Sequence, residues 1–240
     1  MKYASQDYIT YQPDGERNCA QGACTDGEYI YVSLLKIIDY SVGEFDTILQ
    51  KLEMQGNVKM TSASLPLAHC NDLCYNTKTG EIVAVTMDHS RLEIIDPDTL
   101  TIKRTVTFEG GGTPYAISYD AQRDVYILLA NGYFNVLNSD FEITQKAYRY
   151  VDGNHTAQGL HCDGDRIYMP MSAKTSAGTD GNVILVFDRD FRHLYTVTVE
   201  DAKDEIETLI TIDGELYAVY NSKNPSGNGG LIKKLTLQEA

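Results

Sequence analysis

The sequence QGLHCDGDRIYMP, at residues 158–170, decides the fold. In it a short half-polar run leads into an Asp-Gly turn, and the turn leads into a strand rich in aromatic and β-branched residues. The same plan recurs at residues 21–32, 71–83, 115–127 and 207–219. One apolar position marks each copy, at Ala23, Leu73, Ile117, Leu160 and Leu209. These positions follow one another at steps of about 40 to 50 residues, a period that predicts the blades of a β-propeller.

Each repeat is expected to supply four antiparallel strands, of which the marked run is the innermost. Second strands rich in Tyr, Val and Ile are predicted at residues 28–35, 81–88, 125–130, 166–172 and 215–221. Third strands are predicted at residues 36–41, 91–96, 133–138, 182–188 and 230–236. Turns rich in Asp, Asn, Gly and Pro follow them, and outer strands are then predicted at residues 45–53, 100–108, 142–150 and 192–199.

The fifth repeat runs out before an outer strand can form. The N-terminal residues 7–11, DYITY, are strand-like and belong to no repeat. We therefore expect them to pair beside residues 231–237, which would close the ring and remove an open sheet edge. The sequence thus predicts an all-β fold, a five-bladed β-propeller of four-stranded antiparallel blades that forms one domain over residues 1–240.

Composition narrows the classes of partner and the compartment. The chain of 240 residues is 42% hydrophobic and carries a formal net charge of −14. A negative surface repels phosphate backbones and anionic lipids, so we expect neither nucleic acid nor a membrane as partner. Residues 1–7 lack the apolar core of a signal peptide, and the 5 cysteines do not have the spacing of a disulfide scaffold. Both features favour the cytoplasm, or secretion if a signal peptide has been removed.

Side chains at equivalent positions of the innermost strands should form rings around the axis. We expect the site at the face that carries the long loops 172–182 and 221–230, since function is often built on irregular loops. One ring would hold Gln21, Asn71, Tyr115, Gln158 and Glu207. Two residues earlier, on the same side of each strand by its period of two, come Cys19, His69, Thr113, Thr156 and Glu205.

This channel mouth is predicted to bind a small polar molecule, a glycan or a peptide end. The ligand-binding candidates are Gln21, His69, Asn71, Tyr115, His155, Gln158 and Glu207. The alternative is that these polar groups only satisfy one another and trapped water. His69 and His155 could likewise bind a ligand, move a proton or be purely structural.

Three carboxylates are candidates for catalysis, namely Glu205, Glu207 and Asp72. Glu205 and Glu207, two residues apart on one strand face, would repel each other if both were ionised. That repulsion would raise one pKa and prepare the group for acid–base chemistry, with Asp72 of the second blade as a partner. The competing interpretation is that Glu205 is solvated at the mouth and only Glu207 is interior.

No metal or cofactor is expected. Cys19, Cys24, His69, Cys70 and Cys74 fall in the first two repeats, but their gaps differ from the C-x2-C spacing of zinc sites. Cys24 and Cys74 occupy the same repeat position, which suits small core side chains. The sequence contains no G-x-S-x-G, P-loop, H-E-x-x-H or dinucleotide-binding motif.

The phrase at residues 156–160, TAQGL, is echoed by AQGA at residues 20–23. It resembles the T-Q-G-L phrase of the five-bladed plant and bacterial glutaminyl cyclase propellers, a motif shared with other YVTN-like and quinoprotein-like propellers. The resemblance implies a five-bladed fold over the whole chain. Where that family has a blade-two glutamate in a G-E-G phrase, residues 69–74 read HCNDLC, and the pocket tryptophan of that family has no counterpart because the chain contains no Trp. The catalytic motif of the family is therefore not matched.

The expected function is thus that of a binding propeller. An enzyme that acts on a peptide N-terminus or a glycoside through Glu205, Glu207 or Asp72 is the competing class. A pure interaction scaffold, which binds partners through its long loops, is the third.

Overall fold

The computed structural model describes residues 2–86, 90–148, 155–173, 181–200, 204–221 and 230–238. Apart from one turn of 3-10 helix, η1 (Tyr40–Val42), every element within these residues is a β-strand. None of them belongs to a helix long and apolar enough to cross a membrane. The fold is therefore all-β, as the sequence predicts.

Three of the sheets have four strands each, paired antiparallel in chain order. The first contains β2 (Cys19–Thr25), β3 (Tyr29–Asp39), β4 (Glu44–Glu53) and β5 (Val58–Thr61). The second contains β6 (Asp72–Asn76), β7 (Glu81–Val85), β8 (Arg91–Ile95) and β9 (Ile102–Thr107). The third contains β10 (Pro114–Asp120), β11 (Val125–Ala130), β12 (Tyr133–Leu137) and β13 (Ile143–Tyr148).

A nine-stranded sheet holds the remaining strands in two antiparallel parts. One part contains β14 (His155–Ala157), β15 (His161–Cys162), β16 (Ile167–Ala173), β17 (Val183–Phe187) and β18 (His193–Val199), with β14 and β15 both paired to β16. The other contains β19 (Glu205–Ile212), β20 (Glu215–Asn221), β21 (Gly230–Gln238) and β1 (Lys2–Tyr11). The parts join where β1 runs parallel to β18, with Lys2 opposite Thr198 and Tyr3 opposite Val199.

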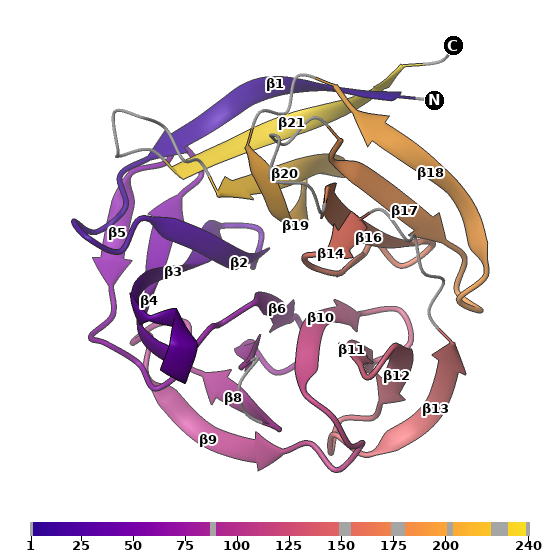
Figure 1. Cartoon of the computed structure of the whole chain (residues 1–240), viewed down its shortest axis with the longest axis horizontal. Coiled ribbons are helices and arrows are strands. Elements are labelled where there is room, and N and C mark those ends of the chain that lie inside the picture. The colour runs from indigo at the N-terminus through magenta and orange to yellow at the C-terminus, as the bar shows by residue number, and fades with distance from the viewer. Residues whose placement is uncertain are drawn as a thin grey trace.

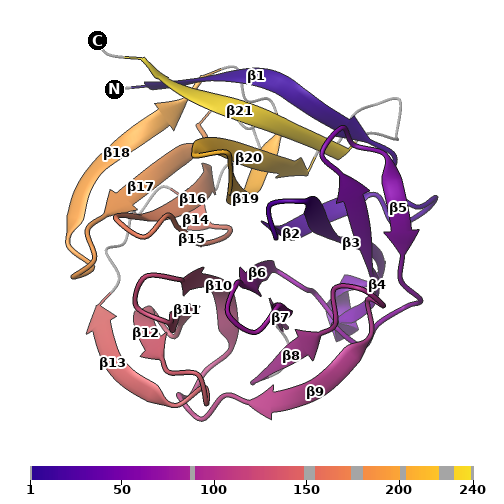
Figure 2. The same cartoon turned by 180° about the vertical axis from the view of Figure 1, so that it is seen from behind.

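These units are arranged radially around one axis (Figures 1 and 2). Strands β2, β6, β10, β14 and β19 lie towards the centre, and β5, β9, β13, β18 and β1 lie at the periphery. The fold is a β-propeller, and the marked runs of the sequence repeats are its innermost strands.

The N-terminal strand closes the ring, which confirms the expected pairing. β1 pairs antiparallel with β21 from Lys2 opposite Gln238 to Tyr11 opposite Gly230, so it is longer than residues 7–11 alone. Ile9, which is 2% exposed, lies opposite the fully buried Ile232. The first strand of the chain thus becomes the outer strand of the last unit, and the parallel contact with β18 extends this closure to the preceding unit.

The strand boundaries predicted for the first repeat are wrong. Residues 28–35 and 36–41 were expected to be two strands, but β3 runs through both, and residues 45–53 form the third strand β4 instead of the outer strand. Residues 34–38 read LLKII, which contains no turn-forming residue, so the strand continues through Asp39 until the turn at residues 40–43. The outer strand is β5, whose residues are all exposed.

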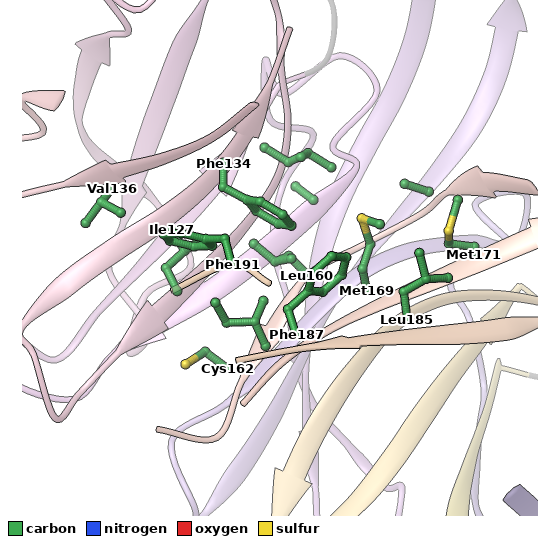
Figure 3. Close-up of a cluster of buried hydrophobic side chains, with 14 of the residues drawn as sticks. Ile127, Phe134, Val136, Leu160, Cys162, Met169, Met171, Leu185, Phe187 and Phe191 are labelled. Atoms are coloured by element: carbon green, nitrogen blue, oxygen red, sulfur yellow. The ribbon is translucent and has the colours of Figure 1, made fainter. Parts of the chain in front are cut away.

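The apolar core lies between neighbouring units. Between the β10–β13 unit and the β14–β18 unit, the ring of Phe134 packs against those of Phe187 and Phe191, with centroids 5.2 and 5.0 Å apart (Figure 3). Aromatic pairs at such separations add to the stability that burial alone provides. Because each interface needs the two flanking sheets in place, the core stabilises the ring as a whole.

The innermost strands share an irregularity at the expected ring position. Register shifts fall between Ala20 and Ala23 on β2, between Pro114 and Ala116 on β10, and between Ile206 and Thr208 on β19. In the fourth unit the strand is interrupted between β14 and β15 at the same level. Bulges of this kind bend a strand and re-aim its side chains, so the alternation of side chains does not continue through this level.

Asp72, the first residue of β6, lies where the innermost strands converge. Its carboxylate is fully buried and accepts four hydrogen bonds. Oδ1 accepts from the Leu73 amide and the Thr208 hydroxyl, both at 3.0 Å. Oδ2 accepts from the amides of Ile117 and Leu160, at 3.0 and 2.9 Å. One carboxylate therefore connects the innermost strands of four units.

Small residues beside Asp72 make this convergence possible. The equivalent positions on the other innermost strands hold Gly22, Ala116, Gly159 and Thr208. A β-carbon on Gly22 would lie 2.5 Å from the Cα atom of Asp72, and one on Gly159 would lie 2.6 Å from the carbonyl oxygen of Glu207. Both distances are too short for any side chain, so packing explains the glycine of the repeated Gln-Gly phrase.

Shortening Ile9 tests the closure by β1. Ile9→Ala should lower the free energy of unfolding by about 2–5 kcal/mol, because it removes fully buried methyl groups from the contact between β1 and β21. Thr10→Ala, on the same strand at an exposed position, is the matched control and should change it by less than about 1 kcal/mol. Equal losses in the two variants, measured by urea unfolding, would show that the strand is not packed as described.

The carboxyl of Asp72 gives the stability of the protein a pH dependence. Burial raises its pKa to about 8, against the opposing effect of its four hydrogen-bond donors. Between pH 4 and 8 the folded state then holds a proton that the unfolded state has released. This contribution to stability is complete below about pH 4 and is lost as the pH rises through 8, with a slope of up to about 1.4 kcal/mol per pH unit.

Urea unfolding at pH values from 5 to 9 measures this slope. Asp72→Asn should flatten it, whereas Asp140→Asn, at an exposed turn, should leave it unchanged. Should Asp72→Asn fail to fold, Thr208→Val removes one donor to the carboxylate and is expected to move the loss of stability to higher pH. An Asp72-dependent rise of stability with pH would mean that the four donors outweigh burial.

Candidate functional site

The channel mouth is built around Glu205, at the start of β19. Its Oε1 atom accepts a hydrogen bond from the Gln158 side-chain amide at 2.7 Å and one from the Ser172 hydroxyl at 2.9 Å. The Gln158 amide also donates to the Ser172 oxygen at 2.5 Å. Gln158 lies between β14 and β15 and Ser172 lies on β16, so two side chains of the fourth unit hold one carboxylate oxygen of the fifth. Glu205 is only half-buried, and its Oε2 atom accepts no hydrogen bond from any described residue.

Asn71 and Gln21 belong to the same level of the mouth. The Asn71 side-chain amide donates to the carbonyl oxygen of Gln158 at 3.1 Å, which links the second unit to the fourth. The Gln21 amide donates to the Ala20 carbonyl at 2.8 Å. Both side chains are buried. Asn71 thus contacts Gln158, and Gln158 contacts Glu205, whereas the Gln21 amide donates to Ala20 and Cys19.

A second polar cluster lies between the first unit and the last. The Cys19 thiol accepts hydrogen bonds from the side-chain amides of Asn221 and Gln21, at 3.2 and 3.4 Å. Burial, and then the charge of Glu207, raises the pKa of Cys19 to about 11. Burial also raises the pKa of Tyr11, and electrostatic interactions with Cys19 and Glu207 raise it further. The Tyr11 hydroxyl is buried and forms no hydrogen bond within the described part of the chain.

Glu205 and Glu207 do not share a strand face in the way that the sequence suggested. The register shift between Ile206 and Thr208 makes Glu207 the bulged residue, which breaks the alternation of side chains. Glu207 is 2% exposed, whereas Glu205 reaches the mouth. Asp72 lies one residue beyond the ring and is inaccessible to solvent. Its four hydrogen bonds therefore indicate a structural role.

The remaining candidates lie at the edge of this group. His69 precedes β6 and packs against Phe45 of β4, with ring centroids 5.1 Å apart. Tyr115 is half-buried and packs against the core shared by the third and fourth units. His155 is the first residue of β14, opposite Ala173 of β16. Most of the two long loops expected to flank the mouth, residues 174–180 and 222–229, lies outside the described residues.

A cavity of about 270 Å³ lies at the opposite end of the innermost strands. Its inner walls come from residues that follow the Asp72 level, namely Ala23, Leu73, Leu160 and Leu209. Further out it is lined by Cys24, Cys74, Ser118, His161, Cys162 and Thr211. Cys24 and Cys74 were interpreted as core packing, and neither Cys162 nor His161 was given a role. Each of these six lining residues follows the ring residue of its own innermost strand by three or four positions. This common spacing is the signal that could have indicated a second pocket.

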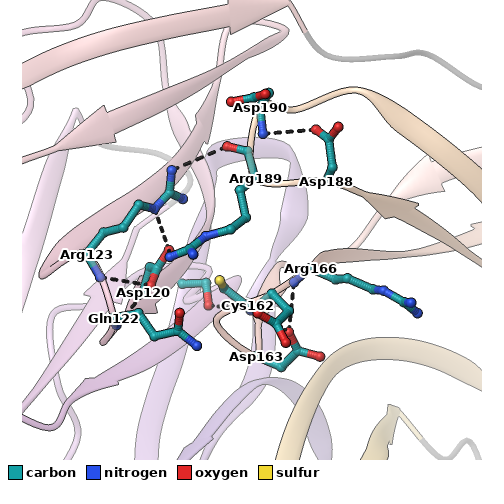
Figure 4. Close-up of polar contacts among 11 residues, drawn as sticks. Asp120, Gln122, Arg123, Cys162, Asp163, Arg166, Asp188, Arg189 and Asp190 are labelled. Carbon is teal, nitrogen blue, oxygen red and sulfur yellow. Dashed lines mark hydrogen bonds and ion pairs between the residues drawn. The ribbon is translucent and has the colours of Figure 1, made fainter.

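The rim of this cavity is fixed by the turns that join the first and second strands. Asp26, Asn76, Asp120 and Asp163 each accept hydrogen bonds from two backbone amides of their own turn. Asp120 also accepts from Arg123 Nε at 2.5 Å, and Arg123 donates to the Arg189 carbonyl of the next unit at 3.3 Å (Figure 4). Within the described residues, no group of three or more His, Cys, Asp or Glu side chains is arranged to hold a metal ion.

Comparison with known proteins shows the fold alone. No protein-family model matches the sequence, and no curated protein matches it. Glutaminyl cyclase from Myxococcus xanthus is similar in structure, with a TM-score of 0.69 at 11% identity over 98% of this chain and 99% of that chain. A DUF4221 family member from Bacteroides vulgatus gives a TM-score of 0.56 at 10% identity over 100% and 99%. Virginiamycin B lyase from Staphylococcus aureus gives 0.50 at 10% identity over 95% and 69%.

Proposed function

We propose that the protein is a binding propeller, which recognises a small polar ligand with a positively charged amino group at the channel mouth. The observation that carries this proposal is the state of Glu205. Gln158 and Ser172 hold its Oε1 atom in place, and its Oε2 atom accepts no hydrogen bond within the described residues. A carboxylate that is fixed by neighbours and partly exposed is preorganised to accept a charge-assisted hydrogen bond.

The surroundings of Glu205 favour a cation over an anion. Glu207 adds a second acidic side chain, and its charge reaches Cys19 and Tyr11 in the same part of the mouth. The buried Tyr11 hydroxyl, which has no hydrogen-bond partner in the described residues, provides a further polar group. The net charge of −14 would draw positively charged molecules towards the protein.

We further propose that the units count as five blades, of the glutaminyl cyclase type. Three separate sheets and the two parts of the nine-stranded sheet support this count. The similarity to Myxococcus xanthus glutaminyl cyclase extends over nearly the full length of both chains, which supports the type.

That similarity also supports a second candidate function, the cyclisation of N-terminal glutamine. In this reaction the free α-amine of a peptide attacks the side-chain amide carbon, and the amide nitrogen leaves as ammonia. The substrate would present its amine to the carboxylates of the mouth, as the proposed ligand does. Glu205 and Glu207 are the carboxylates whose location suits this reaction, because Asp72 is sealed beneath them.

A peptide with a free N-terminus distinguishes these functions. Glutaminyl-alanyl-alanine should bind in isothermal titration calorimetry without releasing ammonia, and Glu205→Gln should weaken binding at least tenfold because the acidic partner of the amine is lost. The N-acetylated peptide should bind at least tenfold more weakly than the free peptide. Glu109→Gln, at an exposed position, is the matched control and should leave the affinity unchanged.

Two outcomes would contradict the proposal. Equal binding of the free and the acetylated peptide would show that the protein does not recognise the amine. Ammonia release that is lost in Glu207→Gln but retained in His193→Ala would make the protein a cyclase.

A further inference from the structure

The cavity at the turn face is separate from the mouth. Residues adjoining the Asp72 level, among them Leu73, Leu160 and Leu209, line its inner part. The exposed residues Thr77 and Ala121 line its outer part, so the cavity reaches the surface on the side away from Glu205. Its volume of about 270 Å³ is near the lower end of the roughly 300–1,000 Å³ that is common for ligand sites.

The polar groups in its wall are almost all uncharged. Burial raises the pKa of Cys24 and Cys74 well above the ordinary value and that of Cys162 to about 12, so all three thiols stay protonated at pH 7. Burial lowers the pKa of His161 to about 4, which leaves its imidazole neutral. His161 Nε2 lies 2.7 Å from the Thr211 hydroxyl.

The charged group at the rim is already engaged. Asp163 accepts the Tyr168 hydroxyl on Oδ2 at 2.7 Å, and its Oδ1 accepts the amides of Asp165 and Arg166. None of the described residues that line the cavity is a lysine or an arginine. An anion would therefore find no cation there, and a cation would find only a carboxylate that its own turn occupies.

A hydroxyl group and two aromatic rings remain available to contact a ligand within the cavity. The Ser118 oxygen accepts the Cys162 amide at 2.8 Å, so its hydroxyl hydrogen can still be donated to a ligand. Tyr75 and Tyr119 contribute aromatic side chains to the wall, and the ring of Tyr75 is held parallel to that of Tyr31. Tyr119 is fixed by its hydrogen bond to Asp124 at 2.7 Å.

The rim itself is built as a rigid frame. Gly164 has a positive φ of 95°, and a β-carbon there would lie 2.3 Å from the Gln122 side-chain nitrogen, so this turn fits closely beneath Gln122. Asp120, Arg123 and Arg189 join the neighbouring turns (Figure 4). A cavity with a fixed rim needs little reorganisation to accept a ligand.

We propose that this cavity is a second binding site, which takes an uncharged small molecule with one or two aromatic rings and a hydrogen-bond acceptor for the Ser118 hydroxyl. It is independent of the mouth, since the Asp72 level separates them. The site follows from the neutral wall, the two tyrosines and the hydroxyl and imidazole groups that the innermost strands bring together.

Probes of equal size and different charge test this inference. Nicotinamide, and quinoline as a second uncharged aromatic probe with a hydrogen-bond acceptor, should bind saturably in ligand-observed NMR titrations at pH 7. Nicotinate and 1-methylnicotinamide, its anionic and cationic analogues, should bind at least tenfold more weakly than nicotinamide. Failure of both uncharged probes to bind, or equal binding of the charged analogues, would overturn the proposal.

Variants at and away from the cavity rim test where the uncharged probes bind. Ala121→Trp, at an exposed rim position, should weaken binding of the uncharged probes at least tenfold by filling the opening. Ser139→Trp, at an exposed turn of the same unit that does not line the cavity, is the matched control and should leave binding unchanged. Glu205→Gln should also leave it unchanged, so failure of the mouth proposal is distinguishable. Equal binding to wild type and Ala121→Trp would place the probes elsewhere and overturn the proposal.

Discussion

The carboxylate of Asp72 is the contact on which the centre of this propeller depends. A buried carboxyl group destabilises the fold unless its oxygens are satisfied, and here three backbone amides and one hydroxyl donate to them. Leu160, one of the donors, lies in the gap between β14 and β15, where the strand ladder is interrupted. This carboxyl group thus stabilises the irregular part of the innermost strands, and those strands position Glu205 at one end and Ser118 and His161 at the other.

Periodicity carried most of the information about the fold. The recurring Asp-Gly turns, followed by strands such as 166–172, predicted the propeller and the closing strand, because one unit repeats its turn chemistry and its apolar pattern. The strands of the first repeat were predicted wrongly because its third strand was placed by spacing alone, although residues 34–38 carry no turn signal. The parallel contact of β1 with β18 depends on the relation between two units, which no local pattern encodes.

The candidate site could be predicted only in part. Residue type and repeat position predicted one ring that includes Asn71 and Gln158, and in the structure Asn71 donates to the Gln158 carbonyl and Gln158 donates to Glu205. The bulges were invisible in the sequence, since a bulge adds one residue without changing the polar pattern, and for that reason the face shared by Glu205 and Glu207 was misjudged. The two ends of the channel also differ in character, with carboxylates at one and neutral thiols, hydroxyls and an imidazole at the other.

The pairing of β1 with β21 has a consequence for biosynthesis. The ribosome synthesises β1 before all of the strands that separate it from β21, so β1 has no lasting partner until those strands have been made. At roughly 5–20 residues per second, the nascent chain carries an unpaired strand edge for a time on the order of ten seconds or longer. Such an edge is prone to pair with other chains, so this protein is expected to need chaperone protection during translation more than a fold whose neighbouring strands are all adjacent in sequence.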